Sequence, residues 1–248
     1  NESHHIEAQR FLAAPRDPEV VLVGSSMSGR LAAAGLPPSF CNLALDGSNA
    51  ATGLGIIVAS GRKPGIVVAE TNALYQPWKP AVVRDALPPF GWLYRTVPPL
   101  RLENQPLILF REALAGPSVI SPVAGSPVEA PPRDVSYLLR RDGEAGPERW
   151  DEAARNLERF IASVEILRAR GCRILLVQLP EDPRLSSLPL HRWVQDRLRE
   201  RLPEDRYAWL RLPGEGPDAY LTGDGVHLQP GSARRAVARI AEDLGRAR

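Results

Sequence analysis

The stretch Val20-Val21-Leu22-Val23-Gly24-Ser25-Ser26 is the part of the chain that determines the fold. Its four consecutive apolar residues, three of them β-branched, predict a short strand buried on both faces, as the strands of parallel sheets are. Gly24 ends this strand, and serine is a preferred residue at the start of a helix. The stretch therefore predicts a strand, a tight turn and a helix, with polar side chains at the carboxyl end of the strand.

The same alternation of strand and helix continues along the chain. Four more apolar runs predict strands, at residues 43–45, 66–69, 174–177 and 208–210. Apolar residues spaced three and four apart predict helices, at residues 5–12, 54–61, 157–167, 193–194 and 236–244. Strands that alternate with helices indicate a parallel sheet covered on both faces. We expect one α/β domain over residues 1–248, a flavodoxin-like three-layer α/β/α fold with a five-stranded parallel sheet in the order 2-1-3-4-5.

Residues 75–150 interrupt this alternation. They hold 13 of the 25 prolines of the chain, together with the aromatic residues Trp78, Phe90, Trp92 and Tyr94. Proline lacks a backbone N–H and breaks helices and strands, so a segment of this composition is not one regular element. We interpret it as an insertion on the sheet, a lid or a substrate platform, in which Trp78 and Trp92 offer a stacking face to a sugar ring. The alternative is a partly ordered excursion without a function.

The overall composition excludes several classes of function. The net charge is only +2 and the charged residues are scattered, so we expect no nucleic-acid partner. No cluster of His, Cys and carboxylate residues predicts a metal site, and no G-x-G-x-x-G follows a strand, so we expect no metal and no cofactor. No apolar run approaches the ~18–20 residues that span a bilayer. Because the chain begins at Asn1 rather than Met, a signal peptide or a membrane anchor upstream stays open.

A phosphate-binding loop is the main alternative for the first motif. Gly24 and Gly29 have the G-x-x-x-x-G spacing of such a loop. The next two residues would have to be Lys and Ser or Thr, but they are Arg30 and Leu31. The missing lysine and magnesium-binding hydroxyl argue against nucleotide binding.

Polar segments follow several of the predicted strands. They are residues 24–26, 46–48 and 70–72, and residues 224–227 come between the last strand and the last helix. Ligands of open parallel sheets bind at the carboxyl ends of the strands. We therefore expect these four segments, which are distant along the chain, to meet at one end of the sheet.

The residue types in these segments suit acyl transfer. The hydroxyl of Ser26 becomes a nucleophile only if a base takes its proton, and His227 is a suitable base because imidazole titrates near neutral pH. Asp224 can orient His227 and stabilise its charged form. The oxyanion formed by the attack needs hydrogen-bond donors, for which the candidates are the backbone N–H groups of Ser26 and Gly47 and the side-chain amide of Asn72.

These segments resemble the conserved blocks of the SGNH, or GDSL-type, hydrolases, and they occur in the same order. Residues 24–26 resemble the nucleophile block, Gly47 the glycine of the second block, Asn72 the asparagine of the third, and residues 224–227 the D-x-x-H block. The resemblance implies catalytic roles for Ser26, Asp224 and His227. It covers the chain on both sides of the insertion but not the insertion itself.

Two departures from the family pattern affect the interpretation. The usual Gly-Asp-Ser is Gly-Ser-Ser here, which leaves Ser25 as a rival nucleophile. The usual Gly-x-Asn is Glu70-Thr71-Asn72, which puts a larger and charged side chain beside the oxyanion site, where Glu70 is a candidate for substrate binding. Such variants resemble extracytoplasmic members that acetylate or deacetylate cell-envelope polysaccharides, and the resemblance implies a periplasmic or cell-envelope location.

Our hypothesis from the sequence is the hydrolysis or transfer of a short acyl ester, an acetyl ester above all, on a carbohydrate or another small ester. The reaction would pass through an acyl-enzyme on Ser26. Two alternatives stay open: a carbohydrate-binding or assembly protein without turnover, suggested by Glu70, and a lipid or carboxyl esterase.

The two cysteines test the predicted strand order. Cys41 and Cys172 both lie where a strand begins, in the second and fourth strands. In the order 2-1-3-4-5 two other strands separate them, and with about 4.8 Å between neighbouring strands their Cα atoms are too far apart for a disulfide. We expect two free thiols.

Overall fold

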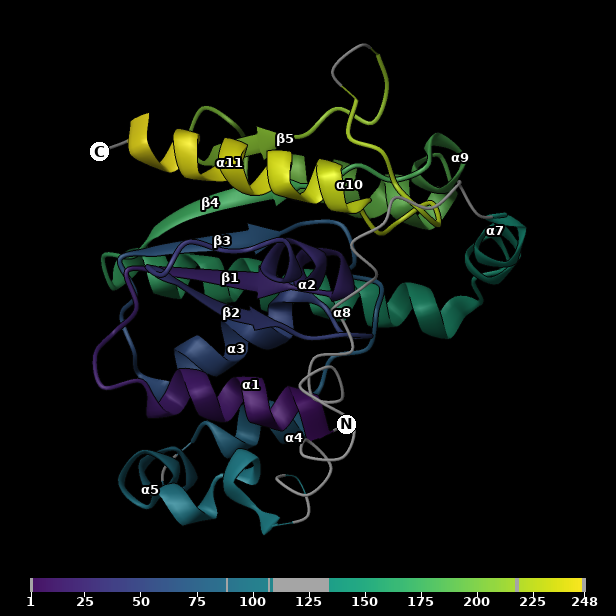
Figure 1. Ribbon diagram of the computed structural model, residues 1–248. Helices are drawn as coiled ribbons and strands as arrows, with labels where there is room; N and C mark the ends of the chain where they lie inside the picture. Colours follow the sequence, from purple (N-terminus) through teal and green to yellow (C-terminus); the bar gives the residue numbers. More distant parts are fainter. Residues whose placement is uncertain (1, 88, 107, 109–133, 217–218, 247–248) are drawn as a thin grey trace.

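A parallel β-sheet forms the centre of the protein (Figure 1). The structure is a computed structural model, and it describes residues 2–87, 89–106, 108, 134–216 and 219–246. The sheet has the order β2-β1-β3-β4-β5, and every neighbouring pair is parallel. Its strands are β1 (Val20–Gly24), β2 (Phe40–Ala44), β3 (Ile66–Glu70), β4 (Arg173–Gln178) and β5 (Ala208–Arg211). The predicted fold class and strand order are confirmed.

Helices cover both faces of the sheet. The side chains of β1 alternate between the two faces: Val21 and Val23 join one buried cluster, and Val20 and Leu22 join the other. The first cluster combines residues of the strands with residues of helices that include α1 (Glu2–Ala13), α3 (Ala50–Ser60), α8 (Pro147–Ala169) and α10 (Pro189–Arg201). The second cluster combines residues of the strands with residues of α2 (Ser26–Ala33) and α11 (Pro230–Arg246). The result is a three-layer α/β/α arrangement.

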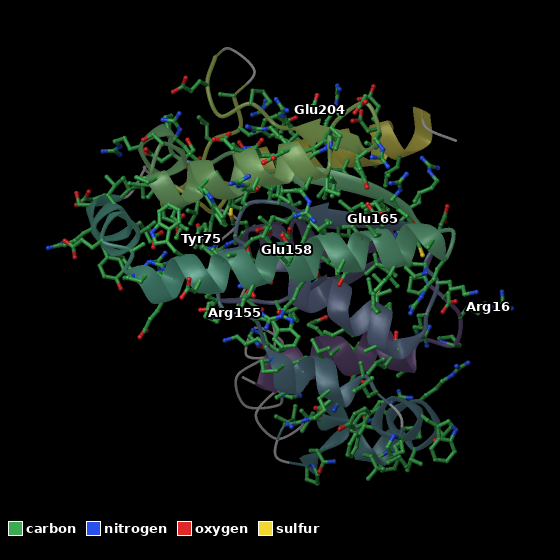
Figure 2. All side chains as sticks on the ribbon, turned by 180° about the vertical axis from the view of Figure 1, so that it is seen from behind. Arg16, Tyr75, Arg155, Glu158, Glu165 and Glu204 are labelled. Atoms are coloured by element: carbon green, nitrogen blue, oxygen red, sulfur yellow. The ribbon has the colours of Figure 1, made fainter. Side chains whose placement is uncertain are left out.

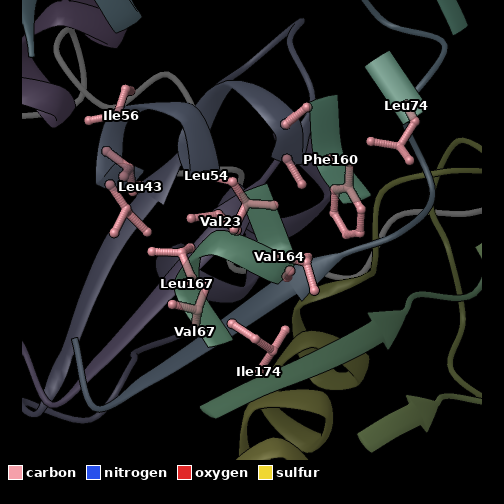
Figure 3. Packing of buried hydrophobic residues seen from close by; sticks show 14 of the residues in the cluster. Val23, Leu43, Leu54, Ile56, Val67, Leu74, Phe160, Val164, Leu167 and Ile174 are labelled. Atoms are coloured by element: carbon pink, nitrogen blue, oxygen red, sulfur yellow. The ribbon is translucent and has the colours of Figure 1, made fainter. Parts of the chain in front are cut away.

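The long helix α8 shows how the sequence pattern produces this packing. Its outer face carries Arg155 and Glu158, which are exposed (Figure 2). Its inner face carries Phe160, Val164 and Leu167, each fully buried among side chains of β1, β3 and α3 (Figure 3). Replacing a buried phenylalanine with alanine costs about 3–5 kcal/mol, so this stripe contributes much of the stability of the first cluster.

The described part of the expected insertion, 75–150, is made of short helices. They are α4 (Pro80–Asp85), α5 (Phe90–Thr96), the 3₁₀ turns η1 (Pro98–Leu100) and η2 (Leu102–Asn104), and α7 (Ser136–Gly143). Residues 109–133 of this segment lie outside the described residues. The long helix α8 begins at Pro147, before the predicted end of the insertion, because proline is well tolerated at the first helical position. A lid or platform function of the segment stays a prediction.

The cysteines and the helices bear on two further expectations. Cys41 and Cys172 are both free, as the strand order predicts. A bilayer-spanning helix needs a long apolar stretch, and none of the helices that the structure describes has one.

Candidate active site

Three predicted catalytic residues meet in hydrogen-bond contact. Ser26 is the first residue of α2, directly after β1, and Asp224 and His227 lie in the loop before α11. The Nε2 atom of His227 is 2.8 Å from the Oγ atom of Ser26, although the two residues are 201 positions apart. The Nδ1 atom of His227 is 2.7 Å from the Oδ2 atom of Asp224. This is the geometry of a Ser-His-Asp triad.

Asp224 fixes the orientation of the imidazole. Its Oδ1 atom accepts hydrogen bonds from the backbone N–H groups of His227, at 2.8 Å, and Val226, at 3.2 Å. Burial alone would raise the pKa of Asp224, but the hydrogen bonds from the ring and backbone of His227 hold this pKa well below its usual range. The carboxylate is therefore ionised at neutral pH and accepts the Nδ1–H of His227, which leaves Nε2 free to accept the proton of Ser26.

Gly225 allows the loop that carries Asp224 and His227 to turn tightly and to bond to a neighbouring segment. Gly225 has φ of +87°, a left-handed conformation that side chains rarely adopt, and a Cβ placed there would lie 2.5 Å from Val135. The carbonyl of Gly225 accepts the backbone N–H of Asp182 at 2.7 Å. Across the loop, Thr222 and Leu228 form an antiparallel bridge. Glycine lets the loop turn tightly against the segment after β4, and this contact positions the imidazole.

Glu70 holds the turn on both sides of Ser26. Its Oε2 atom accepts the backbone N–H groups of Ser25, at 2.9 Å, and Ser28, at 3.1 Å, and the hydroxyl of Ser28, at 2.7 Å. Its Oε1 atom accepts the hydroxyl of Ser25 at 2.7 Å. Glu70 is 2% exposed, so the structure places it beneath the nucleophile turn rather than on the surface that its predicted role in substrate binding would require. At Gly24, a Cβ would lie only 2.5 Å from Oε2, which explains the glycine.

Ser25 has a structural position that differs from that of Ser26. It is the N-cap of α2: its Oγ atom accepts the N–H of Met27 at 3.1 Å and donates to Glu70. The residue is 3% exposed. Of the two candidate nucleophiles, it is Ser26 that contacts the imidazole.

Two of the three predicted oxyanion donors have a free N–H. Within the described part of the chain, neither the backbone N–H of Ser26 nor that of Gly47 has an acceptor. Gly47 is exposed, has φ of +62°, and has no atom within 4 Å of the position of a Cβ. Its neighbour Asp46 is close enough to the triad for His227 to lower the pKa of Asp46, against the larger rise caused by burial. Both N–H groups are therefore free to donate, and the hydrogen bond from the N–H of Leu45 to the carbonyl of Gly24, at 2.9 Å, joins the segment before Gly47 to the end of β1.

The third predicted donor, Asn72, is engaged elsewhere. Its Nδ2 atom donates to the carbonyl of Leu179 and to Oε1 of Glu181, both at 2.8 Å, and its Oδ1 atom accepts the N–H of Leu179 at 2.8 Å. Both amide hydrogens are used, because a buried amide is stabilised only when its polar atoms are paired. Asn72 thus fixes the segment after β4, and its contacts give no support to the predicted oxyanion role.

Among the interactions of the described residues, none joins Trp78 or Trp92 to Ser26, Asp224 or His227. Trp78 is half-buried, and the guanidinium of Arg159 covers its ring, 4.2 Å from the centroid. Trp92 is 61% exposed, but it lies on α5, which packs against α1 on the side away from the sheet (Figure 1). A stacking role for either residue stays a prediction.

A buried cluster around His191 is not identified by the sequence analysis. His191 is 4% exposed, stacks on Tyr75 with ring centroids 4.2 Å apart, and contacts Glu181 through Nδ1 at 3.1 Å. The carboxylates of Glu181 and Asp142 outweigh the effect of burial and raise the pKa of His191 to about 9. The signal was present in the sequence, since His191 shares the inward face of α10 with Val194, three residues later.

Comparisons with known proteins support the fold. No protein-family model matches the chain, and no curated protein matches it. Among solved structures, the chain is similar to one from Bacteroides fragilis described as a "putative acylhydrolase", with a TM-score of 0.51 over 97% of this chain and 94% of that chain. Only 12% of the residues are identical, so the similarity shows a shared fold, and the chemistry has to be argued from the site itself.

Proposed function

We propose that this protein is a serine-dependent acyl-ester hydrolase or acyltransferase. The observation that carries the proposal is the contact of Ser26 with His227, at 2.8 Å, and of His227 with Asp224, at 2.7 Å. Serine becomes a nucleophile when a base within hydrogen-bond reach is itself oriented by a third group, and this arrangement meets that requirement. The resemblance to SGNH hydrolases and the description of the structural neighbour as an acylhydrolase are consistent with it.

The geometry supports a two-step reaction. Ser26 Oγ attacks the ester carbonyl while its proton passes to Nε2 of His227, and the carbonyl oxygen becomes an oxyanion. The N–H groups of Ser26 and Gly47 stabilise this oxyanion, and one such donor is worth about 2.7–4 kcal/mol in related chemistry. As the intermediate collapses, the bond to the alcohol breaks and the alcohol takes the proton from His227. Water or a second hydroxyl then attacks the acyl-enzyme with His227 as base, and Ser26 regains its proton.

The finer assignment is an acetyl group on a carbohydrate, handled outside the cytoplasm. It follows from the resemblance to extracytoplasmic members of the SGNH family. The positions of Trp78 and Trp92 do not contribute to it. A lipid esterase on the same fold would differ by preferring esters with long acyl chains.

The test compares two adjacent serines. With p-nitrophenyl acetate as substrate, we expect Ser26→Ala to lower kcat by at least about 10³-fold, as loss of the nucleophile does in serine hydrolases. We expect a fluorophosphonate probe to label Ser26 in the wild-type protein and in Ser25→Ala, as read by mass spectrometry of the labelled peptide.

Labelling of Ser25 in place of Ser26, or equal hydrolysis rates in wild type and Ser26→Ala, would overturn the proposed nucleophile. A folded protein that reacts with neither acetyl nor longer esters, and with no serine-directed probe, would favour the binding or assembly protein that keeps the fold without turnover.

A further inference from the structure

A buried histidine of α1, which the proposed reaction does not use, contacts the loop that carries Gly47. His4 is 4% exposed, and its Nε2 atom lies 2.6 Å from the carbonyl oxygen of Asp46, 42 positions away. A carbonyl oxygen can only accept a hydrogen bond, so Nε2 carries a proton and donates it. Burial lowers the pKa of His4, so at neutral pH the ring is neutral and this is its single N–H proton.

The carbonyl that His4 contacts belongs to the same peptide group as the N–H of Gly47. A peptide group is planar and trans, so its C=O and its N–H point in opposite directions. A donor that holds the oxygen on one side therefore directs the N–H toward the other side. This N–H is one of the predicted oxyanion donors, and it has no acceptor within the described part of the chain. His4 thus holds the opposite end of the group that carries the donor.

This peptide group is the central one of a tight turn, whose orientation the turn's own hydrogen bond does not fix. The N–H of Ser48 donates to the carbonyl of Leu45 at 3.1 Å and closes the turn. Gly47 has φ of +62° and Asp46 has no positive φ, which is the pattern of a type II turn. A type I turn has the same closing hydrogen bond, but its central peptide is rotated by about half a turn. Glycine adopts both forms, so the contact with His4 is what favours the observed one.

The turn is attached to the end of the strand that leads to the nucleophile. The N–H of Leu45 donates to the carbonyl of Gly24 at 2.9 Å, two residues before the proposed nucleophile. Asp46 is close enough to His227 for the charge of the imidazole to lower the pKa of Asp46, although burial raises it more. The direction of the N–H of Gly47 therefore decides whether this group can face an oxyanion. A hydrogen bond to the carbonyl also polarises the peptide group, which makes its N–H a stronger donor.

We propose that His4 is a positioning residue, whose hydrogen bond to the carbonyl of Asp46 orients the N–H of Gly47 toward the oxyanion of the ester reaction. His4 acts through this peptide group and is not itself a catalytic residue. The catalytic part of the inference rests on the function proposed above, because an oxyanion forms only if an ester reacts. The orientation of the peptide group by His4 does not depend on that function.

The kinetic test compares two amide side chains at position 4, with p-nitrophenyl acetate as substrate. His4→Gln keeps an N–H donor near the position of Nε2, whereas the side chain in His4→Asn is too short to reach Asp46. We expect His4→Asn to lower kcat about tenfold or more with little change in KM, toward the 10²–10³-fold loss that removal of a whole oxyanion donor causes. His4→Gln should restore most of this loss.

The matched control is the next residue of the same helix. His5 is 26% exposed and its Nδ1 atom contacts Asp85 of α4, at 2.8 Å, rather than the turn. The variant His5→Asn removes a contact of α1 without removing the one to Asp46, so its kcat should equal that of wild type. A loss of kcat in His5→Asn equal to that in His4→Asn would show that only the general packing of α1 matters and would overturn the proposal.

NMR of the ¹⁵N-labelled Ser26→Ala protein tests the orientation of the peptide without turnover. We expect the ¹⁵N shifts of the His4 ring to show the proton on Nε2, a measurement that needs no change at His4 and so stands even if His4→Asn does not fold. With the second mutation added, the amide signal of Gly47 should move in His4→Asn and stay in place in His5→Asn, because an amide shift responds to hydrogen bonding at the carbonyl of its own peptide group.

The outcomes distinguish this inference from the proposed function. A proton on Nδ1 of His4 in place of Nε2, an unchanged kcat in His4→Asn, or equal losses in His4→Asn and His4→Gln would overturn the inference and leave the role of Ser26 intact. Absence of hydrolysis by the wild-type protein would overturn the proposed function and the catalytic part of the inference together. The ring proton and the Gly47 signal would then still decide whether His4 orients the peptide.

Discussion

At the scale of single residues, the buried carboxylate of Glu70 is the main support of the turn that carries Ser26. It accepts four hydrogen bonds from Ser25, the residue before the proposed nucleophile, and Ser28, two residues after it. Two of these donors are backbone N–H groups of the first turn of α2, where a negative charge is favourable. The side chain does not reach the imidazole. In the proposed reaction it would act through the position of Ser26, whose Oγ atom lies 2.8 Å from Nε2 of His227.

We predict that Glu70→Gln lowers kcat for p-nitrophenyl acetate more than it changes KM. An amide has one acceptor oxygen, and its NH₂ group would face N–H and O–H donors, so the turn has to shift and at least one buried group stays unpaired. The cost in stability is about 1–3 kcal/mol. The measurements are steady-state kinetics, the rate of fluorophosphonate labelling at Ser26, and urea unfolding.

The matched control for Glu70 is Glu158→Gln on the outer face of α8 (Figure 2), where the carboxylate is 61% exposed and pairs with Arg201. Surface ion pairs contribute about 0–1 kcal/mol, so this variant should behave as wild type. An unchanged kcat and an unchanged labelling rate in Glu70→Gln would show that the buried carboxylate does not position the nucleophile.

At the scale of elements, the backbone conformation of the loop before α11 determines where Asp224 and His227 lie. Gly225 stands between Asp224 and His227, and its left-handed φ lets the loop pass close to Val135 and Leu185. A side chain at this position would meet both neighbours, at 2.5 Å and 3.2 Å. The loop is therefore shaped by the segments it packs against as well as by its own sequence.

Alanine substitutions at Gly171 and Gly225 distinguish the cost of a left-handed backbone from the cost of a steric clash of the new side chain. Gly225 and Gly171 have nearly equal φ, +87° and +88°, but nothing lies within 4 Å of a Cβ at Gly171. We predict that Gly171→Ala costs about 1–2 kcal/mol of stability, from the left-handed backbone alone, and leaves kcat unchanged. Gly225→Ala should cost about 1–3 kcal/mol more, from overpacking, and should lower kcat because the loop moves His227. Urea unfolding and ester hydrolysis give the two readouts, and equal effects of the two variants would contradict the account.

The elements that could be predicted from the sequence are those whose buried side chains form a recognisable apolar run or stripe within the element itself. The run at residues 20–23 predicts a strand because both of its faces are apolar, and the stripe from Leu157 to Leu167 predicts the inner face of α8. The triad was predictable because its residues lie directly beside strand and helix ends. The contacts of Asn72 were not, because its partners, 107 and 109 positions away, are determined by the packing of the segment after β4. The same holds for Glu70, whose partners come from another strand end.

At the scale of the whole molecule, one buried cluster of charges joins the helix α7 to the core. Asp142 of α7 contacts Arg149 of α8 at 2.8 Å and lies 3.6 Å from His191 of α10. On its other side His191 contacts Glu181, in the segment after β4, and stacks on Tyr75. Arg141, 2.7 Å from Asp142, completes the cluster. Three helices and a strand end thus share one set of ionised groups.

We predict that the contribution of this cluster to the free energy of unfolding decreases as the pH rises from 6.5 to about 9. The pKa of His191 rises from 6.5 to about 9 on folding, so the folded state binds the proton more tightly than the unfolded state. The stabilisation is fully present below pH 6.5 and is lost as the pH rises through about 9. We therefore expect the free energy of unfolding of His191→Gln to lie below that of wild type by a few kcal/mol at pH values under 6.5, with the difference shrinking toward pH 9.

Urea unfolding of both proteins across this range measures the difference directly, since other titrating groups cancel between them. A difference that stays constant with pH would mean that His191 contributes through packing on Tyr75 and not through its charge.

The separation of Ser26 from its base, 201 positions along the chain, has a consequence for how the protein matures. During translation the serine leaves the ribosome before the imidazole is synthesised, so the two can meet only after residue 227 has joined the chain. A nascent or truncated chain therefore carries the hydroxyl without a partner to activate it, and stray acylation of half-made protein is avoided. Under the proposed function, ester cleavage would begin only after residues 224–227 have reached Ser26.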